Sequence, residues 1–231
     1  MWTATQHFFT GDFHIDWRHL LRRKPKTAPV ATIPHFSSPE CTRWFIDALK
    51  ASKLYLEYGA GGSTYHAAQY GRFFISIESD KRFLRAVRKR IARDGYLNAA
   101  HQEYVHANIG PTKKWGRPAA FLPPGPNRRD QFAHYSDYPP GLTASGVTPD
   151  LILIDGRFRV ACALKALRAL ATHSGWTLVF DDYTDRDHYH AVEKIIPISE
   201  TVGHMAIFRP SGAIDLEKTD KLIARYEQDD R

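Results

Sequence analysis

The sequence predicts an α/β protein with a doubly wound, mostly parallel β-sheet. Short apolar runs alternate with longer amphipathic stretches along most of the chain, which is the pattern of strands connected by helices. Runs such as LILI (151–154) and TLVF (177–180) are almost entirely apolar, as expected of strands with helices on both faces. The run SETVGHMAIFRPSG (199–212) predicts a terminal antiparallel β-hairpin.

The expected elements follow one another in a regular order. The segment SPE (38–40) predicts the first helix start, because Ser is a common cap and Pro suits the first helical position. The expected strands are 54–59, 73–80, 103–109, 150–156 and 176–183. The expected helices begin near residues 38, 62, 81, 159, 185 and 215.

One long stretch interrupts this alternation. Residues 110–146 contain seven prolines, which oppose a long helix, and connections of this length are usually functional loops. We therefore expect an inserted, lid-like loop. The rest of the chain is expected to be an N-terminal extension (1–37) and a single α/β domain (38–231).

Composition narrows the class of protein. The 231 residues are 43% hydrophobic and 25% charged, a balance that allows a sizeable core. No apolar run is long enough to span a bilayer, and the first residues lack the pattern of a secretory signal. Cys41 and Cys162 have no metal-binding or redox spacing. A cytoplasmic protein without membrane contact is therefore expected.

Basic residues are in excess and gather in two stretches. The formal net charge is +7, and RHLLRRKPK (18–26) and KRFLRAVRKRIAR (81–93) concentrate it. A solvated basic face is the simpler interpretation, and a polyanion footprint is the alternative. Because no RNA-recognition signature accompanies these stretches, nucleic acid is disfavoured as a partner but left open.

A glycine-rich segment after the first expected strand predicts a nucleotide site. Gly59, Gly61 and Gly62 allow a ligand to approach the main chain closely. Glu78 lies 19 residues after Gly59, at the end of the second strand, where a carboxylate can accept both hydroxyls of a ribose. NAD and S-adenosylmethionine (SAM) both carry such a ribose. Thr64 stands where the dinucleotide motif has its third glycine, which disfavours NAD.

The segment EYGAGGST (57–64) resembles the first motif of class I SAM-dependent methyltransferases, an acidic residue followed by alternating glycines. The resemblance implies a Rossmann-like fold with the glycine loop under the methionine and ribose of SAM. It also implies that the acid after the second strand holds the ribose and that a polar residue after the third strand approaches the adenine. The cofactor-binding residues implied in this way are Glu57, Gly59, Gly61, Gly62, Ser63, Glu78 and Asn108.

Acidic residues end the fourth and fifth expected strands. Asp155 follows the fourth strand, and Asp181 and Asp182 follow the fifth. This arrangement resembles metal-dependent O-methyltransferases, and the resemblance implies that Asp155, Asp181 and Asp182 hold Mg²⁺, which lowers the pKa of an acceptor oxygen. Helix capping is the alternative. Asp155 and Asp182 are the expected catalytic residues, through a metal or as a base.

Neighbouring residues indicate the acceptor. Arg157 and Arg159 lie beside Asp155 and are expected to bind an anionic substrate, with a solvated basic rim as the alternative. The Asp/Asn-Pro-Pro-Tyr signature of amino-methylating members is absent from the end of the fourth strand. The expected function is therefore O-methylation of a small, anionic molecule. The alternatives are a catalytically inactive protein that binds SAM or S-adenosylhomocysteine (SAH), and an NAD-dependent oxidoreductase. A homo-oligomer is compatible with each.

Overall fold

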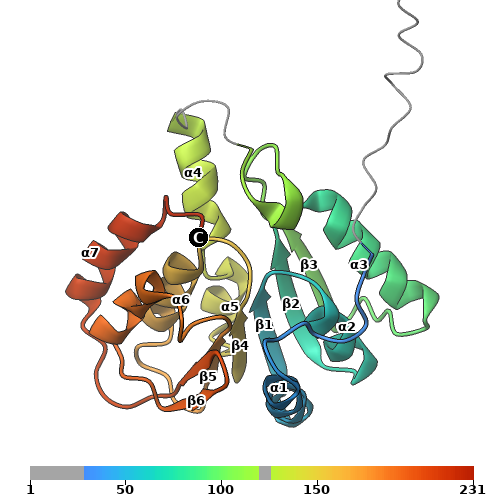
Figure 1. The fold of residues 1–231 in the computed structure, drawn as a ribbon, viewed down its shortest axis with the longest axis horizontal. Coiled ribbons are helices and arrows are strands. Elements are labelled where there is room, and N and C mark those ends of the chain that lie inside the picture. The colour runs from blue at the N-terminus through green and yellow to red at the C-terminus, as the bar shows by residue number, and fades with distance from the viewer. Residues whose placement is uncertain (1–28, 120–125) are drawn as a thin grey trace, which may run out of the picture.

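The computed structural model describes residues 29–119 and 126–231, which form a central β-sheet flanked by helices (Figure 1). The sheet has seven strands in the order β3-β2-β1-β4-β5-β7-β6. The strands β1 to β5 are parallel, and β7 is antiparallel to β5 and β6. The predicted doubly wound sheet with a terminal hairpin is confirmed. The strands are β1 (Leu54–Tyr58), β2 (Phe73–Glu78), β3 (Gln102–His106), β4 (Leu151–Ile154), β5 (Thr177–Phe180), β6 (Glu200–Val202) and β7 (Met205–Phe208).

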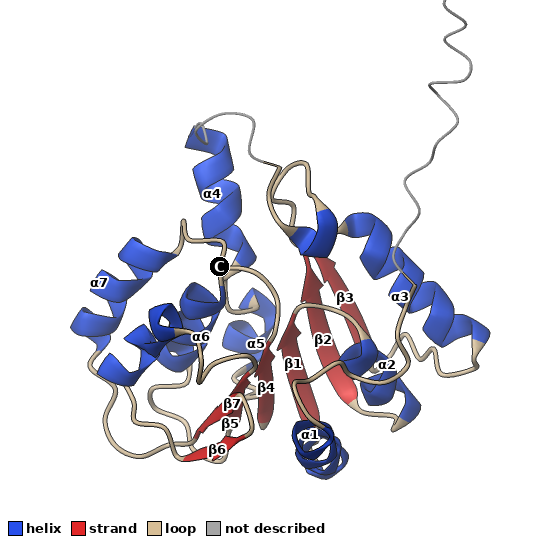
Figure 2. Ribbon diagram, in the orientation of Figure 1, coloured by secondary structure: helices blue, strands red, loops and turns tan. Residues whose placement is uncertain are grey.

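Two layers of helices cover the two faces of the sheet (Figure 2). One layer contains α1 (Pro39–Ala51), α2 (Gly62–Gln69) and α3 (Lys81–Arg93). The other contains α4 (Pro126–Tyr135), α5 (Pro140–Ser145), α6 (Arg159–Ala169) and α7 (Leu216–Tyr226). Because strand residues alternate between faces, Tyr55 packs in the first layer while Leu56 and Tyr58 pack in the second.

Local sequence signals explain where the helices begin. Ser38 Oγ accepts a hydrogen bond from Cys41 N at 3.2 Å, and Pro39 follows it at the start of α1, as predicted. Asp80 caps α3 in the same way, since its Oδ1 accepts from Arg82 N at 2.8 Å. The apolar face of α3 is buried, so most of its basic residues lie at the surface.

The prediction of one continuous loop over 110–146 is wrong for residues 126–145. These residues form α4 and α5, and Phe132, Tyr135 and Leu142 belong to the hydrophobic core. The prolines do not prevent this, because Pro126 and Pro140 stand at the first positions of their helices, where proline is tolerated. Residues 120–125 lie outside the described residues, and lid movement stays a prediction.

Two short 3₁₀ helices complete the elements. The first, η2 (Lys114–Gly116), belongs to a turn closed by a β-bridge between Thr112 and Pro118, which we call the η2 turn (112–118). The second, η3 (Asp187–Lys194), takes the place of the α-helix expected over 185–195. Within the described residues, no helix combines the length and the apolar character needed to cross a membrane.

Candidate functional site

The carboxyl ends of β1, β2, β4 and β5 bring the predicted site residues to one edge of the sheet. The η2 turn and α4 lie at this edge as well (Figure 2). Two glycines let the ends of β1 and β4 meet there. Gly59 has a φ of +105°, and a Cβ on it would lie 2.8 Å from Gly156 Cα. A Cβ on Gly156 would lie 2.2 Å from Tyr135 Oη. A side chain at either position would therefore force the two strand ends apart.

Glu57, near the end of β1, holds the glycine loop in place through hydrogen bonds. Its carboxylate is fully buried and accepts hydrogen bonds from the hydroxyls of Tyr55 (2.7 Å), Ser63 (2.6 Å) and Thr64. Burial raises the pKa of Glu57 to about 7, against the opposing effect of these hydrogen bonds. Ser63 thus donates a hydrogen bond to Glu57 and helps to shape the loop, and contact of either residue with a cofactor stays a prediction.

Thr64 was not among the predicted site residues, although it connects the two ends of the loop. Its hydroxyl donates to Glu57 and accepts from Gly61 N at 2.8 Å. This contact fixes Gly61 as the N-cap of α2. The signal in the sequence was the pair of hydroxyl residues, 63 and 64, following an acid six and seven residues earlier.

The other two loop glycines have different surroundings. A Cβ on Gly61 would meet no atom within 4 Å, so the loop is open at this position. A Cβ on Gly62 would lie 2.3 Å from Ile33 O, because the segment before α1 crosses the start of α2. Phe36 of that segment packs against Phe45 with ring centroids 5.0 Å apart. Gly61 is therefore the loop position with room for a ligand, whereas the Cα of Gly62 faces the chain itself.

Glu78 lies at the end of β2, directly beside the loop. Its Oε2 accepts from Ala60 N at 3.2 Å, and its Oε1 accepts from Ser79 Oγ at 3.0 Å and Asp80 N at 2.7 Å. Burial raises the pKa of Glu78, while the two main-chain hydrogen bonds oppose that shift. The η2 turn packs next to it, since a Cβ on Gly116 would lie 3.3 Å from Oε1.

Asn108 follows β3, the strand beside β2. Its Oδ1 accepts from Gly110 N at 3.1 Å, which orders the turn after the strand, and the residue is exposed. The side-chain amide nitrogen has no hydrogen-bond partner among residues 29–119 and 126–231. Asn108 therefore keeps a side-chain amide available at the end of the strand next to β2, and its contact with a cofactor stays a prediction.

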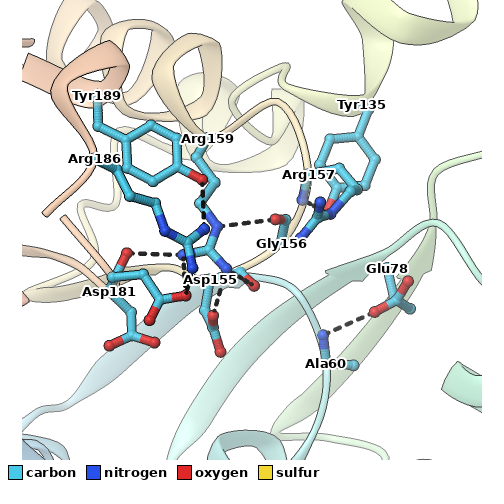
Figure 3. A network of polar contacts seen from close by, with 11 residues as sticks. Ala60, Glu78, Tyr135, Asp155, Gly156, Arg157, Arg159, Asp181, Arg186 and Tyr189 are labelled. Atoms are coloured by element: carbon cyan, nitrogen blue, oxygen red, sulfur yellow. Dashed lines mark hydrogen bonds and ion pairs between the residues drawn. The ribbon is translucent and has the colours of Figure 1, made fainter. Parts of the chain in front are cut away.

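Arg159 occupies the centre of the acidic cluster (Figure 3). It is only 4% exposed and donates to Asp155 Oδ1 (2.9 Å), Gly156 O (3.1 Å) and Asp181 O (2.7 Å). Its Nη1 also lies 3.5 Å from Asp182 Oδ2. These contacts occupy its guanidinium and join the ends of β4 and β5, and binding of substrate by Arg159 stays a prediction. The spacing of four residues from Asp155 was the available signal.

Of the three aspartates in the cluster, Asp181 is buried, whereas Asp155 and Asp182 are partly exposed. Asp181 is 2% exposed, and burial raises its pKa to about 8, with Asp155 and Asp182 adding to the shift. Asp182 Oδ2 accepts from Arg186 Nη2 at 2.7 Å. Asp155 uses only Oδ1, its side chain is 34% exposed, and burial raises its pKa while Arg159 opposes the shift. Asp155 and Asp182, whose side chain is 33% exposed, thus each keep one carboxylate oxygen without a contact among the described residues, but Asp182 pairs with two arginines and Asp155 with one.

Arg157 differs from Arg159 although only one residue separates them. Its main-chain N donates to Tyr135 Oη at 3.1 Å, which fixes the residue at the end of β4. Its side chain has no hydrogen bond or ion pair with any described residue, and its Nε is buried. Figure 3 places it between the Arg159 cluster and Glu78.

Comparison with known proteins identifies the fold. No protein-family model and no curated protein sequence matches the chain. A methyltransferase-like protein from Silicibacter pomeroyi is similar in structure and 28% identical in sequence, with a TM-score of 0.72 over 86% of this chain and 100% of that chain. The fold is that of the class I methyltransferases.

Two more distant structures have lower scores. A methyltransferase from Geobacter sulfurreducens is 12% identical, with a TM-score of 0.44 over 76% of this chain and 82% of that chain. A SAH-bound methyltransferase from Podospora anserina is 11% identical, with a TM-score of 0.44 over 73% of this chain and 77% of that chain.

The arrangement of Asp155, Asp181 and Asp182 does not support the Mg²⁺ site that was expected from the sequence. Within residues 29–119 and 126–231, no three His, Cys, Asp or Glu side chains are grouped so that they could hold a metal ion. The positive charges beside these carboxylates are guanidinium groups, since Arg159 forms ion pairs with Asp155 and Asp182, and Arg186 forms one with Asp182. The positive charges of these arginines relieve the repulsion among the aspartates. Asp182 is accordingly less suited than Asp155 to act as a base.

Proposed function

We propose that the protein is a SAM-dependent methyltransferase that methylates an oxygen atom of a small acceptor. The position of Asp155 carries this proposal. It lies at the end of β4, which pairs with β1, so its available carboxylate oxygen is at the same edge of the sheet as Gly61 and Glu78. A nucleotide-type loop and a candidate base therefore meet on neighbouring strands, where α/β sheets bind their ligands.

The described residues fit SAM in three respects. Gly61 has open space where a side chain would be, so the methionine part can approach the main chain. Glu78 Oε2 accepts one hydrogen bond from the described residues, which leaves it able to accept a ribose hydroxyl. Asn108 presents its side-chain amide beyond the end of β3, where the adenine would lie. When bound, SAM would supply a methyl group carried on a positively charged sulfur.

Asp155 would act as the general base for the acceptor hydroxyl. A base is most effective when its pKa approaches the working pH, and burial raises the pKa of Asp155 above its ordinary range. Arg159 opposes that shift and fixes Oδ1, so the carboxylate stays oriented with Oδ2 available. Asp155 Oδ2 would take the proton of the acceptor hydroxyl, and the methyl group would pass to that oxygen with breakage of its bond to sulfur, which would leave SAH.

Calorimetry with SAM, SAH and NADH is the first test. We expect SAM and SAH to bind and NADH not to bind. Incubation with SAM labelled in its methyl group and a library of small hydroxylated compounds should then yield labelled methyl ethers. Binding of NADH alone would contradict the proposal and favour an oxidoreductase. Binding of SAH without transfer to any hydroxyl compound would favour a protein without catalytic activity.

A further inference from the structure

Arg157 stands apart from the other arginines at the ends of the strands. Arg159 and Arg186 both contact carboxylates, whereas the side chain of Arg157 contacts none within the described parts of the chain. Its Nε–H is buried and has no acceptor among residues 29–119 and 126–231. A buried donor without a partner costs about 1–3 kcal/mol, more when it is charged. A molecule that supplied an acceptor here would recover that free energy.

The charges around Arg157 favour an anion in that place. Burial lowers the pKa of Arg157, and the positive charges of Arg159 and Arg117 lower it further. Arg117 belongs to the η2 turn, which packs beside Glu78, and it is exposed, so a second cationic side chain lies at this edge of the sheet. The carboxylate of Asp155 forms its ion pair with Arg159, and Arg157 has no ion pair with it, although the charge of Arg157 also lowers the pKa of Asp155.

The main chain holds Arg157 in a fixed position. Tyr135 accepts the hydrogen bond from Arg157 N at 3.1 Å and is itself only 1% exposed. The ring of Tyr135 packs against Phe158 with centroids 5.3 Å apart, so the residue after Arg157 is also fixed. A guanidinium mounted in this way loses little conformational freedom when it binds a planar or tetrahedral anion.

We infer that Arg157, assisted by Arg117, binds a carboxylate or phosphate group of the methyl acceptor. That the bound anion belongs to the methyl acceptor rests on the proposed function. Since Asp155 and Arg157 are two residues apart at the end of β4, the methylated hydroxyl lies close to the anionic group. The acceptor class is therefore a hydroxy acid or a phosphorylated alcohol.

Anion binding can be measured without knowing the acceptor. The protein, with and without saturating SAH, is titrated with inorganic phosphate and with acetate at constant ionic strength set by chloride. We expect the wild type to bind at least one of these anions, and the one bound more tightly identifies the anionic group. Arg157→Gln should weaken that binding about 10- to 100-fold, as expected for loss of a charge-assisted hydrogen bond. Arg157→Lys keeps the positive charge and should weaken anion binding less than Arg157→Gln does.

Arg85→Gln is the matched control, because Arg85 is exposed on α3 and the substitution removes the same charge. It should leave anion affinity unchanged. Equal anion affinity in wild type and Arg157→Gln would overturn the inference, as would failure of the wild type to bind either anion. These outcomes are independent of the cofactor: absence of SAH binding would refute the proposed function, whereas anion binding lost in Arg157→Gln would still assign the site.

Turnover supplies a second readout. Hydroxy acids or phosphorylated alcohols methylated by the wild type are compared with their neutral methyl esters. Arg157→Gln should raise KM for the anionic compounds at least 10-fold and leave KM for the esters nearly unchanged. Equal loss for charged and neutral acceptors would show that the substitution disturbs the fold of the site and would contradict recognition of an anion by Arg157.

Discussion

Two arrangements of carboxylates lie near the carboxyl ends of β1, β4 and β5, and they have different partners. One is the buried Glu57 by itself, and the other is a cluster of three aspartates, of which Asp181 is buried. Glu57 accepts hydrogen bonds from three neutral hydroxyls and contacts no cation. The cluster of Asp155, Asp181 and Asp182 instead surrounds the guanidinium of Arg159. Hydroxyls fix a loop without supplying charge, whereas an arginine permits several carboxylates to approach one another. The first arrangement suits a cofactor loop, and the second leaves Asp155 suited to proton transfer.

Asp155→Asn tests the chemical part of this comparison and has the largest expected effect. Removing a general base typically lowers the rate about 10²- to 10⁴-fold. We therefore expect kcat for methyl transfer to fall by that factor while the Kd for SAH changes little, because the cofactor loop is untouched. Single-turnover kinetics and calorimetry on the same preparation measure both quantities.

Asp182→Asn is the control for that substitution. Its carboxylate already contacts Arg186 and Arg159, so we expect less than about a 10-fold loss of rate. Full activity in Asp155→Asn would contradict the role of Asp155. If Asp182→Asn lowered the rate of methyl transfer more than Asp155→Asn did, Asp182 at the end of β5 would be the base.

Arg159→Gln tests whether one arginine stabilises the aspartate cluster. Removing one partner from a buried charged network typically costs about 3–5 kcal/mol. Arg159 is 4% exposed, so we expect the free energy of unfolding in urea to fall by that amount. Arg186→Gln is the comparison: its side chain is 39% exposed, and its ion pair with Asp182 should contribute at most about 1 kcal/mol. Equal losses in the two variants would refute the central position of Arg159.

The sequence was informative wherever the cause of a structural feature is local. The glycine loop, the cap at Ser38 and the buried strands follow from residues close together in the chain, and each is found where it was predicted. The need for Gly156 depends on β1 and Tyr135, which are far away in the sequence. The role of Arg159 likewise depends on the pairing of β4 with β5. The prolines led to the wrong prediction of a loop in place of α4 and α5. The sequence alone does not show that Pro126 and Pro140 are the first residues of helices.

The pH dependence of stability should reveal Glu57. Burial raises its pKa from about 4.5 to about 7 in the folded state, so the folded protein binds this proton more tightly than the unfolded chain. Below pH 4.5 both states are protonated. Between pH 4.5 and 7 only the unfolded chain loses the proton, so folding stability falls with rising pH, by about 3 kcal/mol in total. Urea unfolding at a series of pH values measures this slope.

Glu57→Gln isolates that contribution from Asp181, whose pKa is also raised. The glutamine keeps the shape of the side chain and one acceptor oxygen but cannot ionise. Asp181 lowers stability over the whole interval from about pH 4 to 8, so both proteins should decline there. Between pH 4.5 and 7 we expect the slope of the variant to be shallower than that of the wild type by about 1.4 kcal/mol per pH unit, and above pH 7 the two slopes should agree. The same slope in both proteins would show that Glu57 stays ionised, and the contrast with the aspartate cluster would disappear.

Glu78→Ala tests the cofactor side of the sheet and has the smallest expected effect. The carboxylate accepts hydrogen bonds from Ala60 N and Asp80 N, and we expect it to accept one from a ribose hydroxyl. Its removal should weaken SAH binding by about 1–3 kcal/mol, the usual cost of leaving polar partners unpaired. Glu78→Gln retains an acceptor oxygen and should weaken SAH binding less than Glu78→Ala does. Calorimetric titration with SAH, alongside Arg85→Gln as an unrelated surface variant, measures the difference. If Glu78→Ala bound SAH as tightly as the wild type, the ribose would have to lie elsewhere, and the assignment of β1 and β2 to the cofactor would fail while that of Asp155 and Arg157 to the acceptor could still hold.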